Sequence, residues 1–358
     1  MKFSDVLEIK NGRNQKQVEN PNGKYPIYGS GGIMGYADDY ICEPYTVIIG
    51  RKGTINNPIY VETPFWNVDT AFGLQAKKDI LHPKYLYYFC VHFDFEALNT
   101  TVTIPSLTKA NLLNIDIPLP PLVEQTEIVD TLTSVDELIK IKKQQLELFD
   151  ELTKSRFIEL FGDADYPQVL FENVCAFLRN GANIKQTKGA GGYPITRIET
   201  LSNDVFNIDR LGYADITDLE KYQSYILHHG DILISHINSI AYLGRAVQYR
   251  GQLDTPIIHG MNLLCARIAD SYNPTYIEWF FKTPMAKEYI STITKKAVNQ
   301  ASITTSDLKK MQVPNPPKNL QDQFAAFVEQ TDKSKMAVQQ SIAELEELKK
   351  SLMQKYFG

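Results

Sequence analysis

A short polar segment behind an apolar run carries the side chains best suited to bind an anionic polymer. Residues 51–57 read RKGTINN and follow the strand-like run Thr46–Ile49. Cations neutralise phosphates, and arginine or asparagine can form paired hydrogen bonds with base edges. The candidate contacts with nucleic acid in this segment are Arg51, Lys52, Thr54, Asn56 and Asn57. A solvated hairpin loop is the alternative, because turn residues are also polar.

A comparable segment lies further along the chain. Gly230–Ile234 aligns with Tyr45–Ile49, and the polar residues 235–239 follow it. Candidate contacts in this second region are His236, Asn238, Arg245, Lys185, Lys188 and Arg197. Ser30 is a further candidate in the first region, within the glycine-rich residues 29–35. The glycines there match neither GxGxxG nor GxxxxGK[ST], so they favour a flexible loop over a nucleotide cradle.

Other chemistries find little support. Asn315-Pro-Pro-Lys318 lacks the aromatic residue of the Asn-Pro-Pro-aromatic motif of DNA amino-methyltransferases, and we interpret it as the lead-in to a helix. The six histidines show no HExxH spacing, so we expect no metal site. The four cysteines form no CxxC and are expected to be buried thiols. No convincing set of nucleophile and base is visible, and no cofactor is expected.

Composition and charge place the chain among globular proteins of two or three domains. It has 358 residues, 43% of them apolar, and no apolar run approaches the ~18 residues of a membrane span. Asp5 and Glu8 stand where a signal peptide would be apolar, which predicts a cytoplasmic protein. The net charge is −5, and residues 118–162 hold 9 acidic against 5 basic side chains. Local basic patches elsewhere therefore remain possible.

The elements that must position these candidates are arranged as a repeat. Residues 106–162 align with residues 302–358 at a constant offset of 196, with 15 of 57 positions identical and no gap. Identical positions in the two copies are Pro118/Pro314, Pro120/Pro316, Pro121/Pro317, Gln125/Gln321, Asp136/Asp332, Leu152/Leu348, Phe161/Phe357 and Gly162/Gly358. The regions upstream also match, as in Lys10-Asn-Gly12 with Arg179-Asn-Gly181. One unit of nearly 200 residues thus occurs twice.

Each unit combines a mixed globular region with a helical arm. Strand-like runs such as Ile59–Val61 and Asn262–Ile268 alternate with helical signals at Asp5–Ile9, Pro83–Phe93 and Pro274–Ile290. The predicted fold class is α+β, with two similar domains separated by long helices. The boundaries expected are 1–117, 118–162, 163–313 and 314–358.

In each arm, prolines lead into a short amphipathic piece, and a second helix is expected to begin at a capping box formed by Ser134 and Glu137. The corresponding helix of the second copy should begin near Thr331. Apolar residues three and four apart form a stripe on each helix, namely Leu146, Phe149 and Leu152, and Ile342, Leu345, Leu348 and Leu352. This pattern favours an antiparallel coiled coil between the copies, with two ordinary core helices as the alternative.

Together these features resemble the specificity subunit of type I restriction–modification enzymes. The resemblance rests on the duplicated Pro118–Gln125 motif and its helix ending in Leu-Phe-Gly, and on residues 28–36, 48–53 and 67–72. It covers the whole chain. It implies two target recognition domains that each bind half of a split double-stranded DNA site, in a subunit without catalytic residues.

The resemblance also implies that the arms dock two modification (methyltransferase) subunits, through which restriction subunits join. The arm residues assigned to this role are Pro121, Gln125, Leu146, Phe149, Leu152, Pro317, Gln321, Ile342, Leu345 and Leu348. The second copy departs from the motif, since Asn319 and Leu320 replace the part containing Glu124. The glycine-rich loop has no counterpart after Tyr193-Pro-Ile195, so the second domain should read a different sequence.

An arm of about 25 residues would be about 40 Å long, close to the ~34–36 Å of one DNA turn. Two alternatives stay open: a DNA methyltransferase in its own right, which would bind S-adenosylmethionine unaided, and a scaffold whose globular domains bind protein.

Overall fold

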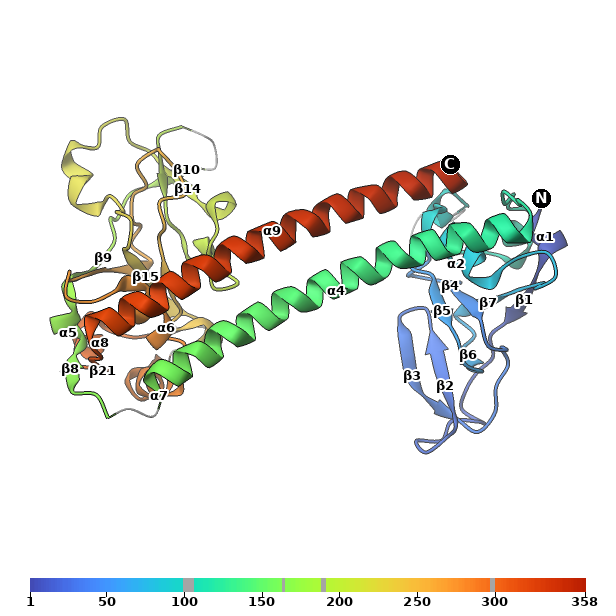
Figure 1. Ribbon diagram of the computed structural model, residues 1–358, viewed down its shortest axis with the longest axis horizontal. Helices are drawn as coiled ribbons and strands as arrows, with labels where there is room; N and C mark the ends of the chain where they lie inside the picture. Colours follow the sequence, from blue (N-terminus) through green and yellow to red (C-terminus); the bar gives the residue numbers. More distant parts are fainter. Residues whose placement is uncertain (99–105, 163–164, 188–190, 297–299) are drawn as a thin grey trace. The chain divides into compact units, whose positions relative to one another are not determined.

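The computed structural model describes residues 1–98, 106–162, 165–187, 191–296 and 300–358. They form two compact units: unit 1 comprises residues 1–146 and 337–358, and unit 2 comprises residues 147–336. Two long helices, α4 (Leu122–Phe161) and α9 (Lys318–Phe357), each contribute residues to both units (Figure 1). No helix among the described residues is long and apolar enough to cross a membrane.

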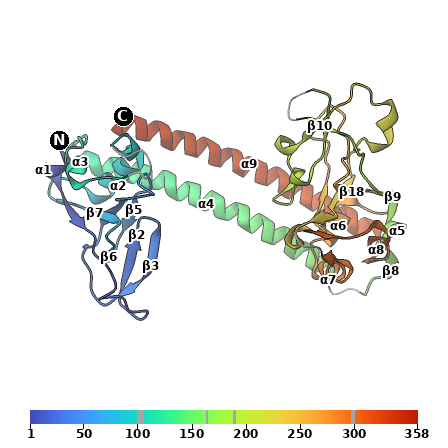
Figure 2. The ribbon, with the colours of Figure 1, turned by 180° about the vertical axis from the view of Figure 1, so that it is seen from behind.

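Unit 1 is built on an antiparallel sheet in the order β1-β7-β4-β5. Its elements are α1 (Phe3–Val6), β1 (Leu7–Asn11), β2 (Tyr25–Gly29), β3 (Gly32–Ala37), β4 (Thr46–Gly50), β5 (Ile59–Val61), β6 (Trp66–Asn67), β7 (Ala71–Ala76), α2 (Pro83–His92) and α3 (Lys109–Leu113). A core containing Val47, Ile49 and Phe72 joins the sheet to α2 and to both long helices. The β2–β3 hairpin lies at the opposite end of unit 1 from the first turns of α4 (Figures 1 and 2).

Unit 2 repeats this plan with a sheet in the order β17-β15-β18-β9. Its main elements are α5 (Phe171–Val174), β9 (Cys175–Asn180), β15 (Ile232–Ser235), β17 (Ala246–Gln248), β18 (Leu263–Ile268), α6 (Pro274–Phe280), α7 (Pro284–Ile293) and α8 (Thr305–Leu308). Shorter strands are β8 (Gln168–Leu170), β10 (Gln186–Thr187), β11 (Tyr193–Ile195), β12 (Leu201–Ser202), β13 (Val205–Phe206), β14 (Gly212–Ala214), β16 (Ile237–Asn238), β19 (Lys295–Lys296), β20 (Ala301–Ser302) and β21 (Gln312–Pro314). Strand for strand, β9, β18, β15 and β17 correspond to β1, β7, β4 and β5.

The shared Asn-Gly pair has the same physical cause in both units. A Cβ on Gly12 would lie 1.7 Å from the carbonyl oxygen of Val68, and one on Gly181 would lie 2.2 Å from the carbonyl carbon of Gly260. Only glycine lets the two backbone segments approach this closely. The repeat therefore preserves a close backbone crossing at the end of β1 and β9.

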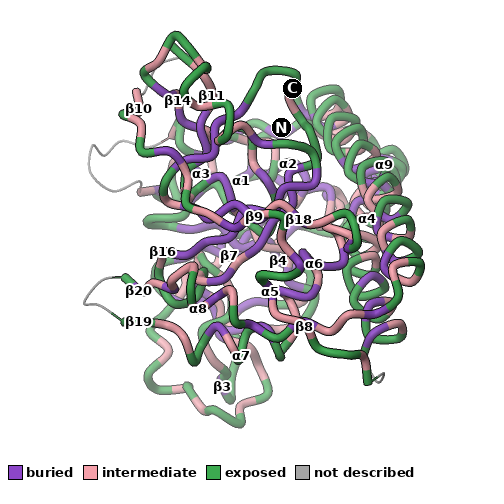
Figure 3. Tube along the Cα trace, turned by 90° about the vertical axis from the view of Figure 1, so that its left-hand side faces the viewer, coloured by how far each residue is buried: buried purple, intermediate pink, exposed green. Residues whose placement is uncertain are grey.

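The long helices run antiparallel within each unit. In unit 1, ion pairs join Lys143 to Glu346 at 2.9 Å and Asp136 to Lys349 at 2.6 Å, so partner numbers fall on α9 as they rise on α4. In unit 2, Asp150 pairs with Lys335 at 2.5 Å and Phe157 meets Phe324 with ring centroids 5.2 Å apart, which gives the same direction. Large parts of both helices remain exposed (Figure 3). The predicted α+β fold with an antiparallel helix pair and an internal repeat is confirmed.

A buried glutamine joins the start of each long helix to its globular region. Gln125 Oε1 accepts a hydrogen bond from His82 N at 2.8 Å, and Gln125 Nε2 donates to Ile80 O and Pro120 O at 3.0 and 2.8 Å. Gln321 is equally buried: it accepts from Asn273 N at 2.9 Å and donates to Pro316 O at 2.8 Å. Buried inside their own units, neither glutamine is available to a partner.

The far end of each long helix packs on the other copy's globular region. Phe357, at the end of α9, meets Tyr85 of α2 with ring centroids 5.0 Å apart. Phe161, at the end of α4, meets Tyr276 of α6 at 4.8 Å, and both ring pairs are edge-on. Each unit therefore needs the start of one long helix and the end of the other. As predicted, a glycine follows each helix, at Gly162 and Gly358.

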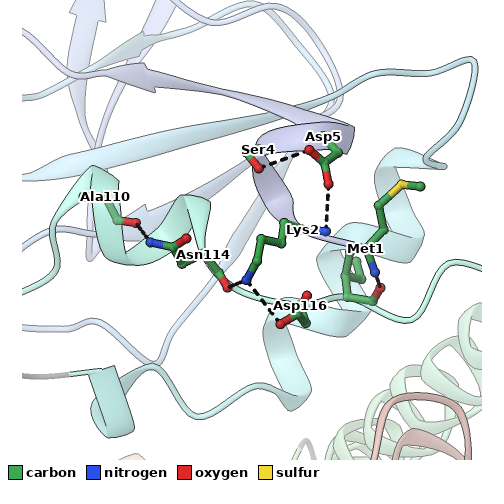
Figure 4. A network of polar contacts seen from close by, with 8 residues as sticks. Met1, Lys2, Ser4, Asp5, Ala110, Asn114 and Asp116 are labelled. Carbon is green, nitrogen blue, oxygen red and sulfur yellow. Dashed lines mark hydrogen bonds and ion pairs between the residues drawn. The ribbon is translucent and has the colours of Figure 1, made fainter.

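The N-terminal segment is fixed along unit 1 by polar contacts (Figure 4). The amino group of Met1 donates to Ile117 O at 2.9 Å. Lys2 Nζ donates to Asn114 O at 3.0 Å and pairs with the Asp116 carboxylate at 3.4 Å. These contacts hold the chain before α1 against the segment that leads to α4.

Several sequence predictions about the arms are wrong. The helix does not restart at Ser134, because Ser134 Oγ donates to Asp130 O within one continuous helix of 40 residues. Thr331 likewise donates to Phe327 O inside α9. Each helix is therefore about 60 Å long rather than about 40 Å. Leu152 and Leu348, expected between the helices, are 50% and 48% exposed.

Other local predictions need smaller corrections. The helical signal at Asp5–Ile9 gives only the single turn α1, followed by β1. The signal at Pro274–Ile290 divides into α6 and α7. Three of the four thiols are buried as expected, whereas Cys175 is half-buried.

Candidate nucleic-acid interface

The end of β4 presents two exposed cations on a fixed backbone. All five residues of the strand are buried, and the next two residues, Arg51 and Lys52, are exposed. Arg51 N donates to Thr70 O at 2.8 Å, while Arg51 O accepts from Leu107 N at 2.9 Å. The Arg51 guanidinium lies 5.7 Å from the ring of Phe72. The backbone is thus held from both sides while both residues are exposed.

Two further candidates lie beside these cations. A Cβ on Gly50 would stand 3.0 Å from Ser30 Cβ and 2.0 Å from Thr54 O. The turn between β2 and β3 and the loop after β4 therefore close around Gly50. The structure brings Ser30, Arg51 and Thr54 together, although they are up to 24 residues apart in sequence.

The two asparagines of this loop differ in their surroundings. Asn56 Nδ2 donates to Asp94 Oδ1 at 2.8 Å, and Asn56 Oδ1 accepts from Phe95 N at 2.7 Å. Its amide thus ties the loop to the turn after α2. Asn57 is exposed. Both asparagines are exposed, and the amide of Asn56 in addition fixes the loop.

The hairpin beside this loop adds residues that sequence patterns did not single out. Ile33, Met34 and Tyr36 on β3 are 56%, 63% and 45% exposed. Large exposed apolar side chains in one place are typical of contact surfaces. They all lie within residues 28–36, which carry part of the family resemblance.

In unit 2 the counterpart of Arg51 is His236. Ile303 N donates to His236 O at 3.0 Å, just as Leu107 N donates to Arg51 O. His236 is only 7% exposed, and burial lowers the pKa of its imidazole, which favours the neutral form. The amide of Asn238 is engaged by Ser235 Oγ at 3.2 Å and by the backbone N–H of Ser239 at 2.8 Å.

The remaining candidates of unit 2 occupy two other places. Lys185 and Arg197 are exposed near β14, where a Cβ on Gly212 would lie 2.9 Å from Arg197 Cδ. Arg245 is engaged by Asp204 at 2.7 Å and by Leu201 O at 2.8 Å. Lys188 lies outside the described residues. The unit 2 candidates thus do not form one cluster.

The comparison with known families decides the identity. A model of the type I restriction modification DNA specificity domain matches residues 1–148 and 171–348. The chain belongs to the family of type I restriction–modification specificity subunits. The resemblance inferred from the sequence is therefore confirmed.

Named relatives of this specificity subunit agree. The putative type I restriction enzyme MjaX specificity subunit of Methanocaldococcus jannaschii is 37% identical over 187 residues, which cover 52% of this chain and 44% of that protein. The EcoKI specificity subunit of Escherichia coli K12 is 25% identical over 347 residues, covering 86% of this chain and 72% of that protein. The aligned region thus spans less than half of the first relative.

Solved structures agree on the fold. The crystal structure of a type I restriction–modification S subunit from M. genitalium matches with a TM-score of 0.62 at 16% identity, covering 100% of this chain and 95% of that one. A structure from a study of complex assembly and conformational transition of a type I system matches with a TM-score of 0.58 at 17% identity, covering 99% and 96%.

Sequence reasoning missed one group of polar residues in this specificity subunit. Asn180, Ser302, Thr304, Ser306 and Lys309 line a cavity together with His236. The repeat could have pointed to these residues, because Asn180 belongs to the shared Asn-Gly pair and Ser302-Ile-Thr304 matches Ser106-Leu-Thr108.

Proposed function

We propose that this specificity subunit is a non-catalytic DNA reader that recognises a bipartite, asymmetric double-stranded site. The observation that carries the proposal is the duplicated strand end. The same backbone hydrogen bond fixes Arg51 in unit 1 and His236 in unit 2, so one frame presents different side chains. Related frames with different side chains would read different half-sites. Residues 1–117 and 163–313 are the proposed target recognition domains.

The chemistry of the candidate residues suits binding. Around the end of β4 stand a guanidinium, an ammonium and two hydroxyls, from Arg51, Lys52, Ser30 and Thr54. Cations and hydroxyls of this kind contact phosphates, and exposed arginine and asparagine can contact bases. Lys185 and Arg197 are proposed to contribute phosphate contacts in unit 2. Catalysis would then belong to a separate modification subunit.

The long helices are the proposed docking surface for two modification subunits, through which restriction subunits would join. Apart from Ile158, the large apolar residues of α4 that are between 46% and 73% exposed are Val123, Leu138, Ile141, Leu148 and Leu152. At about 100° per residue they fall within an arc of about 80°. This outer stripe lies opposite the buried stripe that contains Ile128 and Ile139.

The outer stripe is largely specific to α4. The matching positions of α9 are Asn319, Ser334, Ala337, Glu344 and Leu348, of which only the last is a large apolar residue. Leu152 and Leu348 are equally exposed at the matched position, so one contact recurs on both helices. Near the first half of the stripe lie the acidic residues Glu127, Asp130 and Glu137. A partner helix with an apolar face and basic flanks fits this surface, and docking on α4 should be the tighter of the two events.

Methyl transfer from labelled S-adenosylmethionine to DNA tests the division of labour. The purified chain alone should transfer no methyl group, and activity should appear when a modification subunit is added. Transfer by the chain alone would favour the alternative of an independent methyltransferase. A chain without salt-dependent DNA binding in either state would favour the scaffold alternative.

A matched pair of variants tests the docking surface. Ile141→Glu places a charge in the outer stripe and should weaken binding of the modification subunit by about tenfold, which corresponds to about 1.4 kcal/mol. Ala337→Glu introduces the same charge at the matched, exposed position of α9 and should have little effect. Equal affinities for the two variants would refute the assignment of the stripe.

A further inference from the structure

Unit 2 contains a polar cavity at the end of β15 that corresponds in the repeat to the cationic loop of unit 1. Its volume is about 600 Å³. The polar side chains that line it include Asn180, His236, Ser302, Thr305, Ser306 and Lys309. Nearly all of these groups can donate a hydrogen bond, and none carries a negative charge.

His236 supplies the strongest indication of a ligand. The residue is 7% exposed, and its Nδ1 has no hydrogen-bond partner among the described residues. A buried polar atom without a partner is costly, by about 1–3 kcal/mol. A neutral imidazole carries one donor nitrogen and one acceptor nitrogen. His236, which lines the cavity, therefore has a buried ring nitrogen that the described residues leave without a partner.

The surroundings favour an anionic acceptor. Lys309 has no ion-pair partner within the part of the chain that the structure describes, so its ammonium is available. Asp307, two residues before Lys309, does not line the cavity: its carboxylate accepts from Thr304 Oγ1 at 2.6 Å and pairs with Lys295 at 3.8 Å. An ammonium, hydroxyls and an imidazole together match the donors that commonly contact phosphate oxygens.

The repeat gives an independent argument from position. A β-bridge joins Lys52 to Ser106 in unit 1, and the matching bridge joins Ile237 to Ser302 in unit 2. The cavity thus stands where unit 1 carries Arg51 and Lys52. The second copy lacks the two exposed cations. Asn180, Ser302 and Thr304 have the same residue types at the matching positions of the first copy, whereas Ser306 and Lys309 replace Ala110 and Leu113.

We propose that this cavity binds one backbone phosphate of DNA, with Lys309 and His236 as its principal contacts. The proposal rests on the proposed DNA-reading function and identifies one contact within it. The ligand class is a phosphodiester. Inorganic phosphate or a free nucleotide shares this chemistry, and the experiment must separate these sources.

The test measures affinity of the complex with its modification subunit for a target duplex over a series of salt concentrations. Lys309→Ala should weaken binding by about tenfold on target and unrelated sequences alike, and should reduce the salt slope by about one. Lys310→Ala removes an exposed cation that does not line the cavity and serves as the matched control. Its affinity and slope should remain closer to those of the wild type.

Single methylphosphonate substitutions in the duplex identify the phosphate. One position should weaken the wild-type complex but not Lys309→Ala. His236→Gln should show the same loss of sensitivity if it folds, and Lys309→Ala alone decides if it does not. The proposal is overturned, while DNA recognition stands, if no methylphosphonate position affects the wild type and Lys309→Ala differently. It is also overturned if Lys309→Ala and Lys310→Ala have the same affinity and salt slope. Inorganic phosphate that binds the wild type in the absence of such a position would indicate a free-phosphate site. A wild-type complex that binds no DNA refutes both.

Discussion

The buried glutamines at the helix starts give a prediction whose size follows from the structure. Gln125→Ala removes three hydrogen bonds, to His82 N, Ile80 O and Pro120 O. Gln321→Ala removes two, to Asn273 N and Pro316 O. At about 1 kcal/mol for each bond, we expect losses of about 3 and about 2 kcal/mol in the free energy of unfolding. Both side chains are fully buried, so water cannot replace the lost bonds without opening the structure.

Each unit contains one tryptophan that can report on it. Trp66 belongs to unit 1 and Trp279 to unit 2. Urea unfolding followed by Trp66 fluorescence in a Trp279→Phe background reports on unit 1, and the reverse background reports on unit 2. Gln125→Ala should shift the unit 1 transition by more than Gln321→Ala shifts the unit 2 transition.

Gln144→Ala is the matched control, because Gln144 lies on the exposed side of α4. It should change the free energy of unfolding by no more than about 0.5 kcal/mol. If Gln125→Ala and Gln321→Ala cost no more than Gln144→Ala, the account of how the long helices are fixed to the globular regions is refuted.

Three further predictions concern pH, helix length and base reading. Burial lowers the pKa of His259 from 6.5 to about 4, so the neutral side chain contributes fully to the free energy of unfolding above about pH 6.5, and about 3 kcal/mol of that free energy is lost as the pH falls toward 4. Urea unfolding at pH 6.5 and pH 4 should show a smaller loss for His259→Asn, and an unchanged pH dependence would contradict this assignment. Four residues inserted near Lys143 and four near Gln339 lengthen both helices by about 6 Å, so methylation mapping should show a spacer between the two half-sites that is longer by one or two base pairs. An active variant with an unchanged spacer would show that helix length does not set the distance between the half-sites. Arg51→Ala and Lys52→Ala should either relax one half-site in selection experiments or weaken all binding with a salt slope lower by about one, and equal changes in both half-sites would disprove the assignment to one reader.

The repeat could be predicted because identical residues mark positions where the two copies have the same structural need. Gly12 and Gly181 permit the same backbone crossing, and Gln125 and Gln321 form equivalent bonds. The same residue type at Gln125 and Gln321 indicated that the position is important but not what the side chain does. The partner of Gln125, His82, lies 43 residues away, and the sequence does not indicate that the two residues are in contact.

The helix break at Ser134 was predicted from a local capping pattern that tertiary packing overrides. Val135 and Ile139 are buried, so the helix continues through this segment, and Ser134 bonds to the preceding turn. Leu152 was misplaced because α4 carries two apolar stripes. Spacing alone does not indicate which stripe faces α9.

The candidate contacts show the same limit. Arg51 and Lys52 are exposed at a strand end, where the pattern predicted a loop. Asn56 looked equally suitable, yet its amide bonds with Asp94, 38 residues away. His236 was predicted as a nucleic-acid contact but lies buried, and its backbone bonds to Ile303, 67 residues away. Contacts between distant segments decided these cases, and whether each residue binds DNA stays a prediction.

The central claim is that this chain supplies sequence specificity through two readers and leaves methyl transfer to a partner. The most direct test expresses the chain with its modification subunit in a host free of DNA methylation, followed by sequencing that detects methylated bases. We expect one asymmetric, bipartite motif that appears only when both proteins are present. Methylation by either protein alone, or a single uninterrupted motif, would contradict the claim.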